Sequence, residues 1–326
     1  MKVVEIKKYG GPEVLKIGSR KIPIFKENEV LIKVKAAGLN RPDILQREGM
    51  YPPPKGASDI LGLEIAGEVI KTGKEVRKIK IGDKVCALVA GGGYSEYVPA
   101  PYTQCLPIPK GLNFEEASIL PETFFTIWFN LFIKNKIEKK QRILIHGGSG
   151  GIGTTAIQVT KIFGLKIFTT TRSKNKSIKC KKLGAHFSIN VKETDFEKFI
   201  KEKTNNEGVD IILDIVGGDY VQKNINVLKR NGILINLGWL TGSKVKIDLL
   251  MIMLKRLTIT GSTLRVGSLK EKEKIAKELK KYIWPLIEKK KIKPILCKTF
   301  SIDKVKQAHI YMDKGIHFGK IALKFE

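Results

Sequence analysis

The sequence predicts an α/β protein that combines a doubly wound parallel sheet with a second, mostly β domain. Three observations carry this prediction: a glycine-dense turn at residues 147–153, alternating strand and helix patterns after about residue 122, and turn-punctuated strands before it. The chain has 326 residues, which is long enough for two domains with full cores. We place the parallel sheet at residues 122–264 and the second domain at residues 1–121 and 265–326.

Strand and turn patterns dominate residues 1 to about 120. Val30–Ala36 partly alternates between apolar and polar residues, and the apolar run Ile60–Ile70 is interrupted by Gly62 and Gly67. Glycines and prolines separate the further short strands, which is typical of a mostly β domain.

After about residue 122, short apolar runs alternate with helical patterns, as expected for βαβ units. The predicted strands are 142–146, 166–171, 186–190, 209–214, 232–237 and 257–261. The predicted helices are 152–163, 173–183, 195–204 and 219–228. Beyond the sheet, residues 268–291 form an amphipathic helix with a kink at Pro285, and a strand–helix–strand unit at 294–325 returns to the first domain.

The glycine-dense turn has the spacing of a dinucleotide-binding loop. Gly148 would permit a tight turn, Gly150 would let backbone approach a pyrophosphate, and Gly153 would let the following helix pack on the sheet. The first turn of that helix offers free N–H groups and a partial positive charge to phosphates. The alternative is a glycine-rich turn with a structural role only.

The segment after the second strand of this domain indicates which dinucleotide is preferred. An NAD site would place Asp or Glu there to bind the ribose 2′-hydroxyl, but residues 169–176 contain no carboxylate. Thr171, Arg172, Ser173 and Lys176 instead offer cations and hydroxyls to a 2′-phosphate, which predicts NADPH. The alternative is a set of solvated side chains in a basic protein.

Composition limits the function classes. The net charge is +28, but the lysines are spread along the chain and no aromatic residues are interleaved with them. This pattern does not favour specific nucleic-acid binding, and only non-specific binding at low salt is expected. No run approaches the length of a membrane span, and the first residues lack the apolar segment of a signal peptide, which predicts a cytoplasmic protein without membrane partners. The four cysteines form no metal-binding or disulfide pattern.

Several motifs make the chain resemble the zinc-free quinone oxidoreductases of the medium-chain dehydrogenase/reductase superfamily. The resemblance covers nearly the whole chain and implies a Rossmann domain flanked by the two parts of a GroES-like catalytic domain. The motifs are Gly10-Gly-Pro-Glu13, Leu39-Asn-Arg41, Gln46-Arg-Glu-Gly-Met-Tyr-Pro-Pro-Pro54, Leu61-Gly-Leu-Glu64, Gly91-Gly-Gly93, Leu120-Pro-Glu122, and Ile211-Ile-Leu-Asp214 with Gly217-Gly218.

The resemblance also bears on zinc. The alcohol-dehydrogenase branch holds a catalytic zinc with Cys, His and an acidic residue, and the matching places here are Asn40, Leu63 and Glu64. A single carboxylate does not make a tetrahedral N/S site, so we expect no metal and no Lewis-acid chemistry.

Further site residues are implied by the family. Asn40, Tyr51, Pro52 and Thr126 would lie near the nicotinamide, and Gly150, Gly151 and Ile152 would face the pyrophosphate. The segments containing Gly238, Trp239, Leu264 and Arg265 would close over the cofactor. Val191 replaces a tyrosine that a close relative has near the adenosine. The family also suggests a homodimer paired through Thr258–Gly261.

The predicted activity is zinc-independent hydride transfer from NADPH to a quinone, with Asn40 and Tyr51 as the orienting groups. Tyr51 could alternatively be a plain aromatic wall. Two other functions remain open: reduction of α,β-unsaturated carbonyls such as 2-enals or enoyl thioesters, which needs a proton donor such as Tyr51, and a zeta-crystallin-like role in RNA binding. The histidines are expected to be structural, with His146 nearest to the glycine loop.

Overall fold

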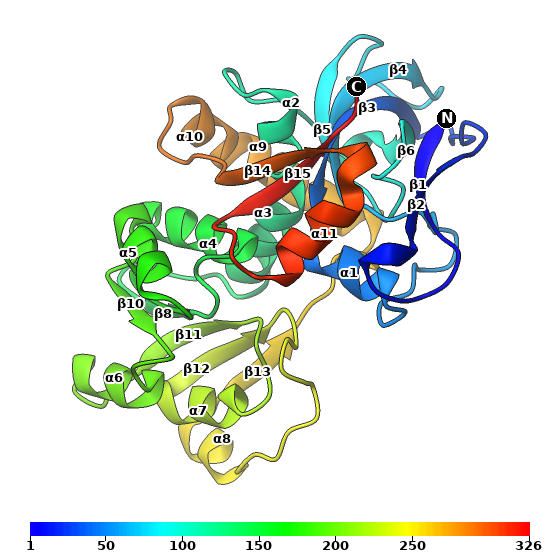
Figure 1. The fold of residues 1–326 in the computed structure, drawn as a ribbon. Coiled ribbons are helices and arrows are strands. Elements are labelled where there is room, and N and C mark those ends of the chain that lie inside the picture. Colours follow the sequence, from blue (N-terminus) through cyan, green and yellow to red (C-terminus); the bar gives the residue numbers. More distant parts are fainter. The chain divides into compact units, whose positions relative to one another are not determined.

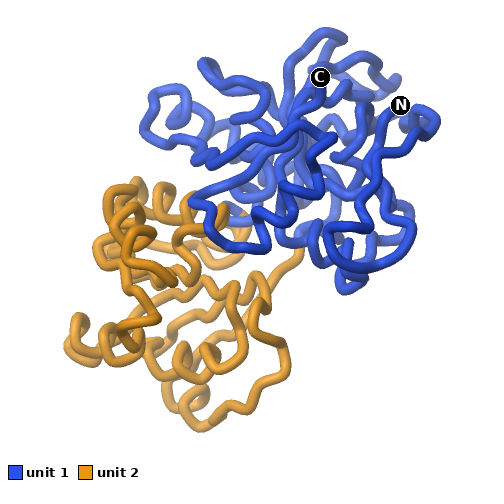
Figure 2. Tube along the Cα trace, viewed as in Figure 1, with its two compact units in different colours: residues 1–128, 264–326 blue, residues 129–263 orange.

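The computed structural model describes residues 1–326, which form two compact units (Figure 2). Unit 1 comprises Met1–Trp128 and Leu264–Glu326, and unit 2 comprises Phe129–Thr263. Helix α3 (Pro121–Trp128) therefore lies in unit 1, whereas residues 122–128 were predicted to belong to the domain with the parallel sheet. None of the helices combines the length and apolar character that a membrane crossing requires.

Unit 2 is built on a six-stranded sheet with the order β10-β9-β8-β11-β12-β13, and all five pairings are parallel. From the central strand β8 the chain runs outward through β9 and β10, then returns to β11 on the other side. This reversal between β8 and β11 is where doubly wound sheets bind ligands, at the carboxyl ends of the strands. The strands are β8 (Arg142–Ile145), β9 (Lys166–Thr171), β10 (Phe187–Asn190), β11 (Val209–Asp214), β12 (Leu228–Asn236) and β13 (Thr258–Gly261).

Helices cover both faces of this sheet, α4 and α5 on one face and α7 and α8 on the other (Figure 1). A π-helical turn, Phe129–Lys134, precedes β8. The helices are α4 (Gly151–Ile162), α5 (Lys174–Leu183), α6 (Phe196–Lys203), α7 (Tyr220–Val227) and α8 (Leu250–Lys255). The side chains of Ser173 and Asp195 cap the starts of α5 and α6, which explains why the predicted helices begin there.

The predicted strands and helices of unit 2 agree with the structure to within one or two residues, except at β12. This strand begins at Leu228 instead of residue 232 because Leu228 already pairs with Val209 of β11. Asn231 has a φ of 62°, so a residue in the left-handed conformation lies inside the strand. The core is formed by fully buried side chains of the central strands, including Leu144, Phe168, Ile212 and Leu234.

Unit 1 contains a seven-stranded sheet with the order β14-β15-β3-β4-β5-β7, and β6 also pairs with β3. All pairings are antiparallel except β14–β15. The last strand, β15, lies between β14 and β3, which confirms that the chain end returns to the first domain. The strands are β3 (Glu29–Leu39), β4 (Glu64–Thr72), β5 (Lys84–Leu88), β6 (Tyr97–Pro101), β7 (Cys105–Pro107), β14 (Leu296–Ser301) and β15 (Lys320–Lys324); β1 (Lys2–Ile6) and β2 (Leu15–Ser19) form a separate hairpin.

The helices of unit 1 pack around this sheet (Figure 1). They are α1 (Arg41–Arg47), α2 (Phe114–Ala117), α3, α9 (Leu269–Tyr282), α10 (Trp284–Glu288) and α11 (Val305–Asp313), with 3₁₀ turns at Pro12–Val14, Tyr102–Gln104 and Ile302–Lys304. The amphipathic segment predicted at 268–291 is α9 followed by α10. The helix is interrupted at Ile283, and Pro285 lies in the first turn of α10, where the N–H that proline lacks is not needed for a helical hydrogen bond.

Candidate active site

The glycine loop joins β8 to α4 at the carboxyl end of the central strand of unit 2. Gly150 is the residue before the first helical turn, and no side chain caps it. The first intrahelical bond is donated by the Thr154 amide to the Gly150 carbonyl at 2.9 Å. The amides of Gly151, Ile152 and Gly153 therefore have no acceptor within the helix and are available to an anion.

The three glycines of the motif differ in how closely other atoms approach them. A Cβ on Gly148 would lie 2.0 Å from the Thr169 hydroxyl oxygen, and one on Gly153 would lie 2.4 Å from the Gly147 carbonyl oxygen. A Cβ on Gly150 would meet nothing closer than 3.5 Å. Gly148 and Gly153 are thus needed for packing, whereas the surface at Gly150 is open, which fits a diphosphate lying against backbone. Gly147 has a left-handed φ of 68°, and the Gly150 amide donates to the Gly147 carbonyl at 3.0 Å, which closes a tight turn that contains Gly148.

The predicted 2′-phosphate residues lie together where β9 meets α5. The hydroxyl of the buried Thr171 donates to the Ser173 carbonyl at 3.2 Å, and the Ser173 hydroxyl accepts from the Lys176 amide at 3.3 Å. Arg172 is exposed and forms no hydrogen bond or ion pair. Arg172 is therefore a free cation next to a helix start, while Thr171 and Ser173 mainly shape the turn. Val191 packs against the core of unit 2.

A buried chain of hydrogen bonds lies beneath the glycine loop. The ring of His146 contacts the Thr170 hydroxyl through Nδ1 at 3.0 Å and Asn224 Oδ1 through Nε2 at 2.7 Å. Asn224 Nδ2 donates to Asp214 at 3.1 Å, and the other Asp214 oxygen accepts from the amides of Val216 and Gly217. Since Asn224 presents its oxygen to the ring, Nε2 carries the proton and Nδ1 accepts. Burial lowers the pKa of His146, so the neutral ring joins the loops that follow β8 and β11.

The segment after β12 packs against the loop after β11 within unit 2. The Leu240 amide donates to the Ile215 carbonyl, and the Thr241 amide donates to the Val216 carbonyl. Trp239 is 44% exposed, and a Cβ on Gly217 would come within 2.4 Å of its ring. Parallel strands end at one edge of a sheet, so Gly238 and Trp239 share that edge with the glycine loop and Arg172.

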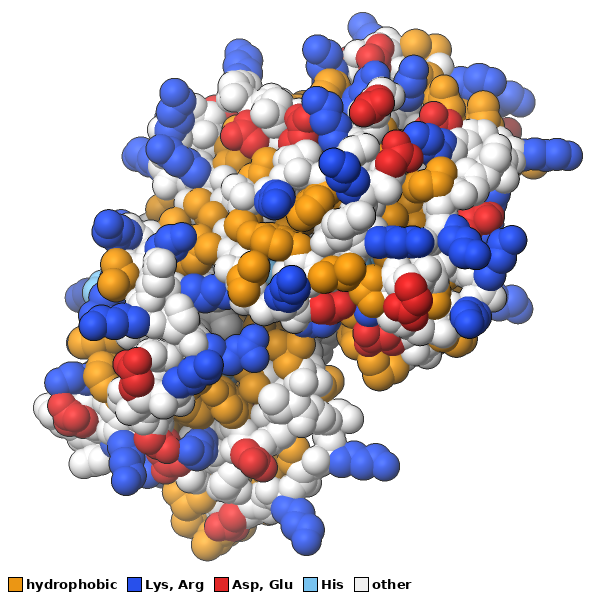
Figure 3. Space-filling view, viewed as in Figure 1, with side chains coloured by type: hydrophobic (Ala, Val, Ile, Leu, Met, Phe, Trp, Pro, Cys, Tyr) orange, Lys and Arg blue, Asp and Glu red, His pale blue; other side chains and the backbone are white.

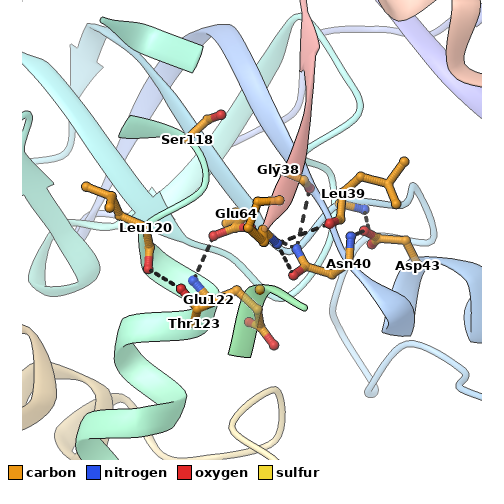
Figure 4. A network of polar contacts seen from close by, with 12 residues as sticks. Gly38, Leu39, Asn40, Asp43, Glu64, Ser118, Leu120, Glu122 and Thr123 are labelled. Atoms are coloured by element: carbon orange, nitrogen blue, oxygen red, sulfur yellow. Dashed lines mark hydrogen bonds and ion pairs between the residues drawn. The ribbon is translucent and has the colours of Figure 1, made fainter. Parts of the chain in front are cut away.

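In unit 1, Asn40 belongs to a buried polar cluster (Figure 4). Its Nδ2 donates to Glu64 Oε1 at 3.0 Å and to the Gly38 carbonyl at 3.4 Å, and its Oδ1 accepts from the Lys320 ammonium. The same ammonium forms an ion pair with Glu64 Oε1 at 2.6 Å. Glu64 is fully buried, and a Cβ on Gly38 would lie 2.1 Å from its carboxylate, so only glycine fits there.

Glu122 lies at the edge of this cluster, at the start of α3. Its amide donates to Glu64 Oε2 at 2.8 Å, while its own carboxyl group points away from Glu64 (Figure 4). Burial and the charge of Glu64 raise the pKa of Glu122 to about 7, although Lys320 and Lys272 oppose the shift. The cluster therefore contains a half-buried carboxyl group that is partly protonated at neutral pH.

Arg265 holds the segment that contains Tyr51. Its guanidinium donates to the Ala90 carbonyl and Gln46 Oε1, each at 2.8 Å, and to the Tyr51 carbonyl at 3.4 Å. The guanidinium carbon lies 5.2 Å from the centre of the Tyr51 ring, within the range of a cation–π contact. Arg265 is thus 8% exposed and engaged within unit 1, and burial lowers its pKa. Leu264 beside it is also buried.

The structure brings only some of the predicted unit 1 residues together. Asn40 lies in the Glu64 cluster, Tyr51 stacks with Arg265, Pro52 is exposed and Thr126 is partly exposed. Glu122 and Lys320 also belong to the cluster, although neither was among the predicted site residues. Glu122 belongs to the motif Leu120-Pro-Glu122, which the chain shares with the family, but the motif alone indicates no role for it. Lys320 is one of 60 lysines and arginines, and no neighbouring residue in the sequence distinguishes it.

The residues of the cluster do not fit a zinc ion. Leu63 offers no ligand atom, Asn40 Oδ1 and Glu64 Oε1 are both bonded to Lys320, and no group of three His, Cys, Asp or Glu side chains is present. Zinc sites in proteins use Cys, His and carboxylate ligands in a tetrahedral arrangement.

The fold and the glycine loop define an oxidoreductase of the medium-chain dehydrogenase/reductase superfamily. Residues 26–110 match the model of the alcohol dehydrogenase GroES-like domain, and residues 151–281 match that of the zinc-binding dehydrogenase. The quinone oxidoreductase of Sus scrofa is 30% identical over 311 residues, which cover 95% of this chain and 93% of that protein. The chain belongs to the quinone oxidoreductase family.

Solved structures agree with this assignment. The Escherichia coli quinone oxidoreductase complexed with NADPH has a TM-score of 0.89 and 29% identity, with 99% of this chain and 100% of that chain covered. The JamJ enoyl reductase also has a TM-score of 0.89, at 26% identity, with 100% and 99% covered. The fold therefore occurs in quinone and enoyl reductases alike.

The glycine loop gives a first prediction. Gly153→Ala should lower the free energy of unfolding by about 2–4 kcal/mol, because its Cβ would overlap the backbone of Gly147 and Gly148. Gly150→Ala is the matched control and should change stability by less than about 1 kcal/mol. Urea denaturation measures both, and equal losses for the two variants would contradict this account of the loop.

Glu122 gives a prediction of pH dependence. A folded-state pKa of about 7 lies above the unfolded value near 4.5, so the wild type should lose stability as pH rises through 7, when the half-buried carboxyl ionises beside Glu64. Glu122→Gln removes that cost. We compare the free energies of unfolding of this variant and the wild type by denaturant unfolding. Their difference should shift in favour of the variant by about 1–3 kcal/mol as the pH is raised from 5 to 8.5. The surface substitution Glu273→Gln should show no such trend; a pH-independent difference for Glu122→Gln would refute the shift.

Proposed function

We propose that this protein is an NADPH-dependent quinone oxidoreductase that works without zinc. The observation that carries the proposal is the N-terminus of α4, which begins with glycines and is open to a ligand. Arg172, which forms no ion pair, follows the next strand, and residues 169–176 around it contain no carboxylate. This arrangement suits a dinucleotide diphosphate together with a 2′-phosphate. The likeness to the quinone oxidoreductase of Sus scrofa and to the Escherichia coli quinone oxidoreductase complexed with NADPH supports the same choice.

In this proposal unit 2 binds the cofactor. The amides of Gly151, Ile152 and Gly153 would hold the diphosphate, and Arg172, helped by Lys176 and the Ser173 hydroxyl, would hold the 2′-phosphate. Gly238 and Trp239 would border the cofactor at the same sheet edge. The bound NADPH supplies a hydride to the acceptor.

Unit 1 would orient the acceptor. We retain Asn40 and Tyr51 as the groups nearest the reacting atoms, with Pro52, Thr126, Leu264 and Arg265 around them. The bonds of Asn40 to Glu64 and Lys320 keep its amide in one orientation, and Arg265 keeps Tyr51 in place. Fixed groups of this kind contribute by positioning the acceptor. The hydride-reduced quinone, a monoanion, would then take one proton from water.

A second candidate, reduction of α,β-unsaturated carbonyls, is favoured by Glu122. Hydride addition to a carbon–carbon double bond leaves a carbanion that must be protonated, and a general acid works best with a pKa near the working pH. The carboxyl of Glu122, with a pKa of about 7, meets this requirement. The likeness to the JamJ enoyl reductase points the same way.

Small molecules are the proposed partners. Lysine and arginine side chains are scattered over the face shown in Figure 3, with carboxylates among them, so no single basic stripe marks a nucleic-acid site there.

The edge strand β13 is largely exposed, with Ile259 at 40%, which supports a homodimer joined through Thr258–Gly261.

Cofactor selectivity tests the role of Arg172. Arg172→Ala should lower the ratio of kcat/KM for NADPH to that for NADH by about 10- to 100-fold, because a charge-assisted hydrogen bond contributes about 1.5–3 kcal/mol. Lys182→Ala, at the other end of α5, is the control and should leave the ratio unchanged. An unchanged ratio in Arg172→Ala would remove the 2′-phosphate assignment.

A panel of acceptors tests the reaction. Naphthoquinones, phenanthrenequinone and 2-enals are compared with NADPH and NADH in steady-state assays. We expect quinones to be reduced with NADPH, and Glu122→Gln to leave that rate within about threefold. An enzyme that reduces enals but not quinones would select the second candidate, and Glu122→Gln should then lower the rate about 100-fold or more.

A further inference from the structure

A buried lysine of α9 has no part in the proposed function so far. Lys272 lies near the start of this helix and is 5% exposed. Its ammonium donates one hydrogen bond, to the Arg265 carbonyl at 3.1 Å, and it forms no ion pair. An ammonium has three N–H donors, so two donors of Lys272 have no acceptor within the chain.

The carboxyl group of Glu122 on α3 lies near this ammonium. Helix α3 packs against α9, and the side chain of Glu122 points away from Glu64 and forms no hydrogen bond or ion pair (Figure 4). Burial lowers the pKa of Lys272, and the charges of Glu122 and Glu271 oppose that shift. An ammonium and a carboxyl group therefore lie near each other in unit 1 without a bond between them.

These two groups border the residues that are proposed to orient the acceptor. Lys272 is bonded to the backbone of Arg265, whose guanidinium packs on the Tyr51 ring. Glu64 accepts from Asn40 with one oxygen and from an amide at the start of α3 with the other. The unused donors of Lys272 thus belong to the same part of unit 1 as Asn40 and Tyr51.

Stability does not explain a lysine at this position. Burying a charge is unfavourable unless the charge is paired and fully hydrogen-bonded, and Lys272 meets neither condition. Such exceptions to the rules of packing are expected where a protein meets its ligand. The two unused donors suit an oxygen atom that becomes negatively charged, because a hydrogen bond from a cation to an anion is stronger than one between neutral groups.

We propose that Lys272 is a catalytic residue that donates hydrogen bonds to the acceptor oxygen as negative charge develops on it. This inference rests on the proposed function and names the class of acceptor, a conjugated carbonyl compound that becomes an oxyanion when hydride adds to it. The hydride brings two electrons and leaves the acceptor as a monoanion. The ammonium stabilises this charge without giving up its proton, and the monoanion takes one proton from water.

Variants of Lys272 separate catalysis from a structural role. Lys272→Met should lower kcat for quinone reduction by about 10- to 100-fold, because a charge-assisted hydrogen bond to the oxyanion is lost. Its Tm should equal or exceed that of the wild type, since a partly bonded buried charge is removed. Lys272→Arg keeps the charge and should recover at least part of kcat. Lys274→Met, an exposed lysine on the same helix, is the matched control and should change neither kcat nor Tm.

An unchanged kcat in Lys272→Met would overturn the proposal. A loss of kcat together with a lower Tm, with no recovery in Lys272→Arg, would also overturn it, because Lys272 would then only support the Arg265 backbone.

A binding experiment does not depend on activity. 2-Hydroxy-1,4-naphthoquinone is an anion at neutral pH, and 1,4-naphthoquinone is its neutral counterpart. Titration calorimetry with NADP⁺ present measures the affinity of both for the wild type and Lys272→Met. We expect the variant to bind the anion about tenfold or more weakly and the neutral compound within about threefold of the wild type.

Equal losses for the two compounds, or no loss for either, would overturn the role of Lys272. A wild type that reduces no acceptor would instead refute the proposed function, while the comparison of the two compounds would still decide on Lys272.

Discussion

The buried carboxylate of Glu64 is the constraint around which unit 1 is organised. Its two oxygens accept from Asn40, from Lys320 and from the amide of Glu122. These partners stand at the starts of α1, β15 and α3, while Glu64 itself begins β4. Four elements that are distant in sequence therefore meet at one charge. Burying an ion pair adds little net stability, but removing one partner is costly, so the pair acts mainly to specify this arrangement.

Unit 2 also contains a buried polar network, and it includes the carboxylate of Asp214. The neutral ring of His146 and the amide of Asn224 connect the loops that leave β8 and β11, and Asp214 completes the chain at the amides of Val216 and Gly217. Both loops lie at the strand ends where a dinucleotide would bind. A fully satisfied buried network keeps such loops rigid, which lowers the entropy cost of ordering them around a ligand.

Local patterns in the sequence predicted the parallel sheet and the glycine loop well, because each depends on neighbouring residues. The close packing at Gly153 follows from the spacing of the glycines, and the start of α5 lies within one residue of the predicted start at Ser173. The boundary at Leu228 was missed because pairing with Val209 sets it. Lys320 and Glu122 were missed for a stronger reason. Their roles arise from contacts with Glu64, which is distant from both in the sequence, and no local period encodes such contacts.

The ammonium of Lys320 also limits the chemistry that the Glu64 cluster can perform. A zinc ion activates a substrate by accepting its oxygen as a further ligand and stabilising negative charge on it. Lys320 has already donated all its N–H groups to Leu39, Asn40 and Glu64, so it has no position left for a substrate oxygen. An acceptor that needs Lewis-acid activation gains nothing from this cluster. An acceptor that is electron-poor by itself, such as a quinone, needs from this cluster only to be held in place, and a cluster that fixes Asn40 is suited to that task.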